Sequence, residues 1–185
     1  MKETQVVNHR KAILINGLPA SGKTSVGRKI AENYNVPLLS LDVIKEAMFE
    51  ELGIGDRDYN RKLGRTCKRI IWSILADFPK DALVIIDAWF GMPPHDEIIQ
   101  SLSGAQISTI LEIWCHVPGS LLKSRYVDRV GSRHKGHPGK EYGDELIKIA
   151  KIAEPMRIGP VYFVNTSDYE KINYCDIFNW IEVHL

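Results

Sequence analysis

Four residues near the N-terminus fit the pattern G-x-x-x-x-G-K-[ST] of a phosphate-binding loop: Gly17, Gly22, Lys23 and Thr24. The apolar run 12–16 precedes them and a helical pattern over 22–34 follows, so backbone N–H groups can converge on phosphate oxygens. In such a loop the lysine reaches the β- and γ-phosphates and the threonine hydroxyl coordinates Mg²⁺. We therefore expect ATP and Mg²⁺ to bind to Gly17, Pro19, Ala20, Ser21, Gly22, Lys23, Thr24 and Ser25. A glycine-rich turn without a ligand is the alternative, and the flanking elements disfavour it.

Two aspartates each follow an apolar run that reads as a strand. Asp42 comes after the run 37–41, where it can act as a general base or as the N-cap of the next helix. Asp87 comes near the end of the run 82–89, where phosphate-loop proteins place an acidic group near Mg²⁺ or its waters. A second capping aspartate is the alternative at Asp87. We expect Thr24 and Asp87 to form the metal site.

The stretch "GLPASGKTS" (17–25), followed by "SLDVIKEAMFEEL" (40–52), resembles a group of small P-loop kinases of the AAA type. That group includes chloramphenicol phosphotransferase, zeta-toxin-type kinases and the polynucleotide 5′-hydroxyl kinase domain. In these enzymes an aspartate after the second strand takes the proton from the acceptor hydroxyl, and Asp42 is the matching position. The flanking D-x-(I/L)-x-E-A-M pattern is most similar to the chloramphenicol kinase. Beyond about residue 50 only the order of the elements matches.

The segment 125–145 resembles the lid of adenylate-kinase-like enzymes, in which arginines close over the triphosphate. Arg125 and Arg129 lie four residues apart on one helix face, and Arg133 follows in a basic, glycine-rich stretch that we expect to be a mobile loop over 129–145. The resemblance implies that Arg125 and Arg129 are catalytic and that Arg125 and Arg133 contact ATP. A solvated, charged helix face is the alternative.

Two further polar clusters have open roles. Thr166 follows the last apolar run, where the resemblance implies contact with adenine; capping of the last helix explains it equally well. A basic stripe repeats every four residues with two flanking lysines: Arg61, Arg65 and Arg69, with Lys62 and Lys68. This stripe is either the wet face of an amphipathic helix or a docking site for an anionic acceptor.

The elements that must position these residues alternate along the chain. Five short apolar runs read as strands buried on both faces: 12–16, 37–41, 82–89, 108–117 and 160–165. Helical patterns lie between them at 22–34, 43–52, 59–77, 93–102, 119–130, 142–153 and 169–184. This order predicts an α/β fold with a five-stranded parallel sheet and helices on both faces. The resemblance implies that this fold is of the adenylate-kinase-like P-loop NTPase type. We expect one domain over 1–185.

Composition narrows the function classes. The formal net charge of +1 lacks the basic footprint of a general nucleic-acid binder. Three widely spaced cysteines fit neither a disulfide framework nor a metal knuckle, so we expect reduced thiols. The first ten residues hold no apolar targeting segment, and no run is long enough to span a membrane. We expect a cytoplasmic protein with no membrane partner, and the oligomeric state stays open.

These observations lead to a predicted function: an ATP- and Mg²⁺-dependent kinase, similar to chloramphenicol phosphotransferase, that phosphorylates a hydroxyl of a small molecule. Lys23, Asp42, Arg125 and Arg129 would carry catalysis. A polynucleotide 5′-hydroxyl kinase is the nearest alternative, and the small net charge disfavours it. A nucleotide-switched binding protein is the third, in which Asp42 would only cap a helix.

Overall fold

The computed structural model describes residues 10–185, and residues 1–9, including most of the N-terminal stretch considered above, lie outside the described residues. Five parallel strands form one sheet in the order β2-β3-β1-β4-β5. The strands are β1 (Arg10–Asn16), β2 (Leu38–Ser40), β3 (Leu83–Asp87), β4 (Ile107–His116) and β5 (Val161–Asn165). The predicted strands are therefore confirmed, with boundaries that differ by one to two residues.

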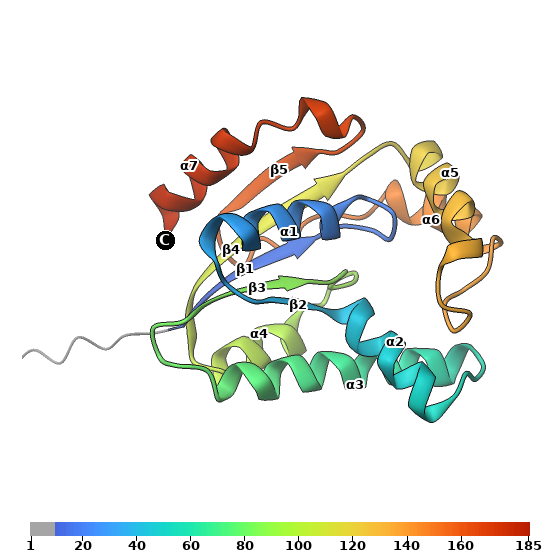
Figure 1. Cartoon of the computed structure of the whole chain (residues 1–185), viewed down its shortest axis with the longest axis horizontal. Coiled ribbons are helices and arrows are strands. Elements are labelled where there is room, and N and C mark those ends of the chain that lie inside the picture. The colour runs from blue at the N-terminus through green and yellow to red at the C-terminus, as the bar shows by residue number, and fades with distance from the viewer. Residues whose placement is uncertain (1–9) are drawn as a thin grey trace, which may run out of the picture.

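Helices cover both faces of this sheet, as Figure 1 shows. They are α1 (Lys23–Tyr34), α2 (Leu41–Leu52), α3 (Arg57–Ala76), α4 (Asp96–Gly104), α5 (Gly119–Arg129), α6 (Tyr142–Ala150) and α7 (Tyr174–His184). Short 3₁₀ turns η1 (Val130–Ser132) and η2 (Tyr169–Lys171) follow α5 and precede α7. The predicted α/β fold, with helices on both faces of a parallel sheet, is confirmed.

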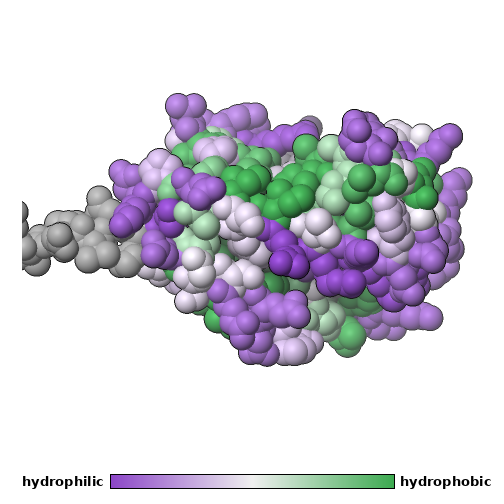
Figure 2. Space-filling model, turned by 90° about the horizontal axis from the view of Figure 1, so that it is seen from below, coloured by the Kyte–Doolittle hydropathy of each residue, from purple (hydrophilic) through white to green (hydrophobic). Residues whose placement is uncertain are grey.

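Alternation along the central strand β1 explains the two layers. Ile13 and Ile15 pack in one apolar cluster with residues of α1 and α7, whereas Ala12 and Leu14 pack in another with residues of α3 and α4. Successive strand residues point to opposite faces, so a run without polar interruption requires cover on both sides. Figure 2 looks onto the molecule from the side of α3 and shows an apolar area beside a band of hydrophilic residues.

A third apolar cluster lies at the carboxyl ends of the strands. It joins Leu18 and Ala20 of the loop after β1 to Leu122 and Tyr126 of α5 and to Leu146 of α6. The expected loop at 129–145 is more structured than predicted, because η1 occupies its start and α6 begins at Tyr142. Within residues 10–185, no helix is both long and apolar enough to cross a membrane. Cys67, Cys115 and Cys175 are all free thiols, as expected.

Candidate active site

The loop between β1 and α1 has the backbone shape that a phosphate cradle needs. Gly17, Ala20 and Gly22 have positive φ angles of 145°, 69° and 84°. A Cβ atom at Gly17 would collide with the carbonyl oxygen of Cys115, so only glycine fits there. Gly22 is the N-cap of α1 and offers no side-chain cap, which leaves the N–H groups of the first helical turn for an anion.

A buried polar network fixes the start of this loop. Asn16 accepts hydrogen bonds from the backbone N–H groups of Gly17 (2.8 Å) and Phe90 (3.3 Å) through its Oδ1 atom. Its Nδ2 atom donates to Oε1 of Glu112 at 2.7 Å, and Glu112 is fully buried in β4. Sequence reasoning missed both residues, although an acidic residue inside the apolar run 108–117 was a usable signal.

The carboxylate of Asp87 and the hydroxyl groups around it form a set of oxygen ligands that fits a magnesium site. Its Oδ2 atom accepts from the Thr24 hydroxyl at 2.6 Å and from the Ser40 hydroxyl at 3.2 Å. Its Oδ1 atom is buried without a hydrogen-bond partner in the described part of the chain. Mg²⁺ prefers hydroxyl, carboxylate and phosphate oxygens, so the residues fit the ion. Residues 10–185 hold no cluster of three or more His, Cys, Asp or Glu side chains for a metal, and a phosphate-assisted site needs none.

Asp42 does not cap α2, so the capping interpretation is wrong. The helix begins at Leu41 and its N-cap residue is Ser40, while Asp42 lies within the first turn. The Asp42 carboxylate instead accepts from Nη2 of Arg133 at 2.7 Å, and 48% of its side chain is exposed. Burial alone would raise the pKa of Asp42, but the positive charges of Lys23 and Arg133 outweigh it and lower that pKa. Asp42 is therefore an ionised carboxylate beside the phosphate loop.

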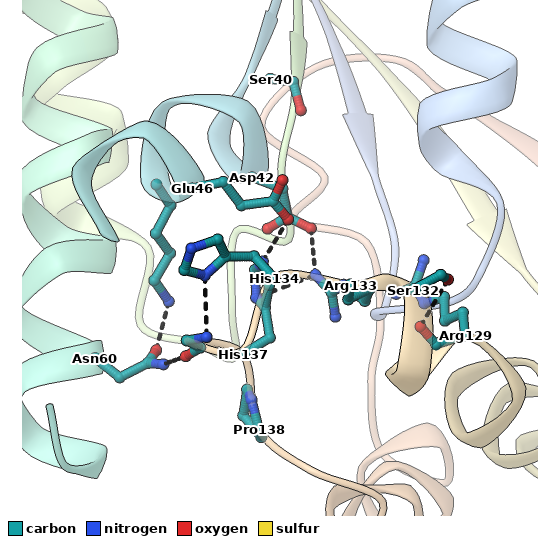
Figure 3. Close-up of polar contacts among 12 residues, drawn as sticks. Ser40, Asp42, Glu46, Asn60, Arg129, Ser132, Arg133, His134, His137 and Pro138 are labelled. Atoms are coloured by element: carbon teal, nitrogen blue, oxygen red, sulfur yellow. Dashed lines mark hydrogen bonds and ion pairs between the residues drawn. The ribbon is translucent and has the colours of Figure 1, made fainter. Parts of the chain in front are cut away.

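The predicted lid docks on α2 through a chain of side chains that Figure 3 shows. Arg133 also donates to Nδ1 of His137 (3.1 Å), and Nε2 of His137 lies 2.7 Å from Oε1 of Glu46. Since Arg133 can only donate, Nδ1 of His137 accepts and Nε2–H donates to Glu46. The ring of Phe49 stacks on His134 with centroids 5.1 Å apart. Sequence reasoning missed His137 and Glu46, because their pairing joins segments about ninety residues apart.

The two lid arginines lie in different surroundings. Arg125 donates through Nη2 to the carbonyl oxygens of Thr166 (2.9 Å) and Ser167 (3.0 Å), and its guanidinium lies 4.7 Å from the ring centroid of Tyr169. Arg129 is partly buried, 5.7 Å from the ring centroid of Tyr126. Burial and the nearby charge of Arg133 lower the pKa of Arg129, and Asp42 opposes this. Only Arg129 therefore shares the surroundings of Asp42.

Thr166 anchors the phosphate loop through a buried hydrogen bond. Its fully buried hydroxyl donates to the carbonyl oxygen of Ser21, and α7 is capped by Asn173 instead. The capping alternative for Thr166 is therefore wrong. Tyr169, which the sequence did not single out, places its ring where a Cβ atom at Gly22 would collide with it.

Buried polar atoms without partners gather at this site. In residues 10–185 there are five such atoms, and four belong to predicted site residues: Ser21 Oγ, Asp87 Oδ1, Arg125 Nη1 and Arg129 Nε. A buried polar group without a hydrogen bond is costly, so an orphaned cluster calls for a missing partner. Phosphate oxygens would accept hydrogen bonds from the hydroxyl and guanidinium groups, and a metal ion would bind the free carboxylate oxygen of Asp87.

Beside the loop lies a cavity of about 840 Å³. Lys23, Asp42, Asp87, Trp89 and Arg133 line it next to the phosphate loop, together with one face of α3 and the lid. A cavity of this size accommodates a small molecule. Trp89 also lines this cavity, whereas its neighbour Phe90 is buried in the core cluster with α3 and α4.

A family model described as an AAA domain matches residues 13–142, which include the phosphate loop, both aspartates and the lid arginines. The chain belongs to this family. A cytidylate kinase of Methanococcoides burtonii is 28% identical over 124 residues, which cover 65% of this chain and 63% of that enzyme. The match therefore spans less than two thirds of that relative's length.

Solved structures agree with this family. A candidate kinase from Chloroflexus aurantiacus superposes with a TM-score of 0.85 at 29% identity, covering 95% of this chain and 98% of the other. A gluconokinase from Sinorhizobium meliloti shares the fold at a TM-score of 0.58 and 20% identity, over 85% of this chain and 83% of its own. Family and fold together are those of small P-loop kinases.

Proposed function

We propose that the protein transfers the γ-phosphate of ATP to a hydroxyl group of a small molecule, with Asp42 as the general base. The observation that carries this proposal is the placement of Asp42. Its carboxylate caps no helix and lines the same cavity as Lys23 and Asp87. An acceptor hydroxyl in that cavity would lie between the base and the phosphate site. We extend the proposal to a chloramphenicol-phosphotransferase-like enzyme of the cytoplasm, with one domain and a lid over 125–145.

Each residue of the loop then has a defined task. Lys23 and the N–H groups at the start of α1 bind the phosphates, and Thr24, Asp87 and Ser40 hold Mg²⁺ directly or through water. The bound ion would neutralise phosphate charge. Asp42 accepts the proton of the acceptor hydroxyl as its oxygen bonds to the γ-phosphorus and the bond to the β–γ bridging oxygen breaks, which releases ADP.

The ion pair with Arg133 bears on the strength of this base. A base works best with a pKa near the working pH, and Arg133 helps to hold the pKa of Asp42 below its usual range. The phosphates of ATP would compete with Asp42 for the guanidinium of Arg133. We propose that this competition frees Asp42 when both substrates are bound.

The test of the base compares Asp42→Asn with the wild type in ATP-dependent phosphorylation of a screened alcohol, or in slow ATP hydrolysis. Asparagine keeps the size of the side chain but is a far weaker base, so we expect a fall of roughly 10²–10⁴-fold in rate. ATP affinity should change little. Because Ser40 is the N-cap residue, Asp42→Ala should not show the loss of about 1 kcal/mol that accompanies a lost cap. A wild-type rate of phosphorylation in the Asp42→Asn variant would contradict the assignment of Asp42 as the general base.

One observation supports the alternative function, a polynucleotide 5′-hydroxyl kinase. Arg61, Arg65 and Lys68 on one face of α3 line the cavity. A nucleic acid on this face would give affinity that falls steeply with salt concentration. Binding of a 5′-hydroxyl oligonucleotide at 50 and 200 mM salt separates the two functions.

A further inference from the structure

The wall of the cavity opposite the phosphate loop carries several positively charged side chains. Arg61, Arg65 and Lys68 recur at intervals of four and three residues on one face of α3, and Lys45 faces them from α2. Arg69, part of the stripe that the sequence suggested, is exposed and does not line the cavity.

The acidic residues that line the cavity are already engaged. Asp42 pairs with Arg133, Asp87 with Thr24 and Ser40, and Glu145 with Arg57. Asp56 caps α3, and Glu141 accepts from the backbone N–H of Gly139. None of these five carboxylates therefore forms an ion pair with Arg61, Arg65, Lys68 or Lys45.

Most of these cations, in contrast, lack anionic partners; Arg61 is the exception, because it forms an exposed ion pair with Asp58 at 3.2 Å. Arg65 and Lys68 have no hydrogen bond or ion pair within residues 10–185, and Lys45 donates only to the neutral amide of Asn60. Burial lowers the pKa of Lys45 and of Lys68, and neighbouring acids only partly oppose this. Lys45 and Lys68 are half-buried, whereas Arg65 is exposed. Half-buried positive charges without counter-charges are costly, and an anionic ligand relieves that cost.

Gly64 supplies an independent observation in the same wall. It lies in the interior of the twenty-residue helix α3 and lines the cavity between Arg61 and Arg65. A glycine there destabilises a helix relative to alanine. A Cβ atom at this position would lie 3.7 Å from Nζ of Lys45, which is an ordinary contact, so packing within the protein does not require glycine. A ligand that lies close to the backbone of α3 would account for the glycine.

We propose that the acceptor carries an anionic group, a phosphate or a carboxylate, in addition to its hydroxyl. This group binds to the face of α3 formed by Arg61, Arg65 and Lys68 together with Lys45, above Gly64. The inference rests on the proposed function, because it places the acceptor in the cavity that Asp42 lines. It adds the class of acceptor, a phosphorylated or acidic alcohol.

The experiment measures stabilisation of the full chain, saturated with Mg·ADP, by inorganic phosphate, ribose 5-phosphate and gluconate, with ribose and glucose as neutral partners. A ligand that binds the folded state raises the melting temperature by mass action. We expect inorganic phosphate and at least one of the two organic anions to stabilise the wild type, and the neutral sugars to have no effect. Comparison of the stabilisation by ribose 5-phosphate with that by gluconate shows whether the site prefers a phosphate or a carboxylate.

Matched variants assign the effect to α3. Arg65→Ala and Lys68→Ala should each weaken anion binding by about tenfold, the scale of a lost hydrogen bond to a charged group. Arg69→Ala removes the same charge from the same helix outside the cavity and should bind anions as the wild type does. Gly64→Ala should raise the melting temperature by about 2–4 °C while weakening binding of the organic anion.

Equal stabilisation by inorganic phosphate in the wild type, Arg65→Ala and Arg69→Ala would overturn the inference, as would an absence of any stabilisation by anions. Binding of a 5′-hydroxyl oligonucleotide alone, with steep salt dependence, would overturn it in favour of a polynucleotide acceptor. Neither result tests the role of Asp42 as the general base. The phosphorylation rate of the Asp42→Asn variant tests that role separately.

Discussion

Arg125 and Arg129 lie one turn apart on α5, and their guanidinium groups face different parts of the site. Arg125 holds the carbonyl oxygens of Thr166 and Ser167 and stacks on Tyr169, whose ring lies over Gly22. Arg129 lies where the charges of Asp42 and Arg133 act on it. Arg125 is thus suited to hold the nucleotide end of the site, and Arg129 to act on the transferred group.

We therefore expect the two alanine variants to separate kinetically. Arg129→Ala should lower kcat by roughly 10²–10³-fold with little change in KM for ATP, as for the loss of one donor to transition-state charge. Arg125→Ala should raise KM for ATP by about tenfold, because the segment 166–169 loses a charged hydrogen-bond donor. Steady-state kinetics over a range of ATP concentrations distinguish the two. Identical profiles for both variants would contradict this division.

Residues that carry chemistry in a local pattern were predictable, and those that act through distant contacts were not. The phosphate loop, Asp42 and Asp87 were named from spacing and position, and Arg133 from the resemblance; all of them line the cavity or the loop beside it, while their roles stay predictions. Glu112 and Tyr169 act through contacts with residues far away in the sequence. No local pattern encodes such contacts, because they depend on strand order and on helix packing.

At the scale of elements, the lid contains a histidine, His137, whose pKa is lowered when the lid is docked. Burial and the charge of Arg133 lower the pKa of His137, while Asp42 and Glu46 oppose the shift. The unfolded or undocked segment, with an ordinary histidine pKa of about 6.5, therefore binds more protons than the docked one. Docking is favoured most above pH 6.5 and weakens as the pH falls through that value. Protonation also removes the Nδ1 acceptor that Arg133 needs.

Hydrogen exchange of the amides of residues 133–138 measures this effect at pH 7.5 and 5.5, after correction for intrinsic rates. We expect protection to decrease at pH 5.5 in the wild type and to change less in His137→Gln, whose amide does not titrate in this range. The control His116→Gln removes another histidine with a lowered pKa, which lies outside the lid at the end of β4 against Phe163, and should keep the wild-type response. If the His137→Gln variant kept the full loss of protection at pH 5.5, another group would be responsible for the pH dependence.

The elements themselves were predicted well because their patterns are strong. Short apolar runs bounded by helical patterns leave few alternatives to a parallel sheet with two covered faces. The beginning of α2 was predicted two residues late, because Asp42 looked like a cap while Ser40 holds that position. The lid was predicted as an open loop, since its contacts through Phe49 and His134 join residues far apart in the sequence.

At the scale of the whole molecule, Glu112 connects the phosphate loop to the far side of the sheet. Its carboxylate accepts from Asn16 (2.7 Å) and from the backbone N–H groups of Met156 and Arg157 (3.0 Å each). Glu112→Ala would leave these donors without partners, which should cost about 3 kcal/mol or more and lower the melting temperature by roughly 6–12 °C. Thermal unfolding with and without Mg·ATP measures both the stability and the nucleotide response.

The exposed Glu32 provides the control for this substitution. Glu32→Ala should change the melting temperature by no more than about 2 °C, because its pair with Lys29 lies on the surface. Glu112→Gln should be intermediate, since one of its two groups would then present an N–H to another donor. An unchanged melting temperature in Glu112→Ala would show that the buried network is dispensable.

The central position of β1 has a consequence for synthesis of the chain. One side of β1 pairs with β3, which emerges early, and the other pairs with β4, which begins only at Ile107. A nascent chain that has left the ribosome only as far as Gly104 therefore presents an unpaired edge of β1, whose centre Ala12–Ile15 is apolar, and such an edge recruits other chains. The same strand leads into the phosphate loop, and Gly17 packs on the carbonyl oxygen of Cys115 in β4, so the loop acquires its native surroundings only after β4 has emerged.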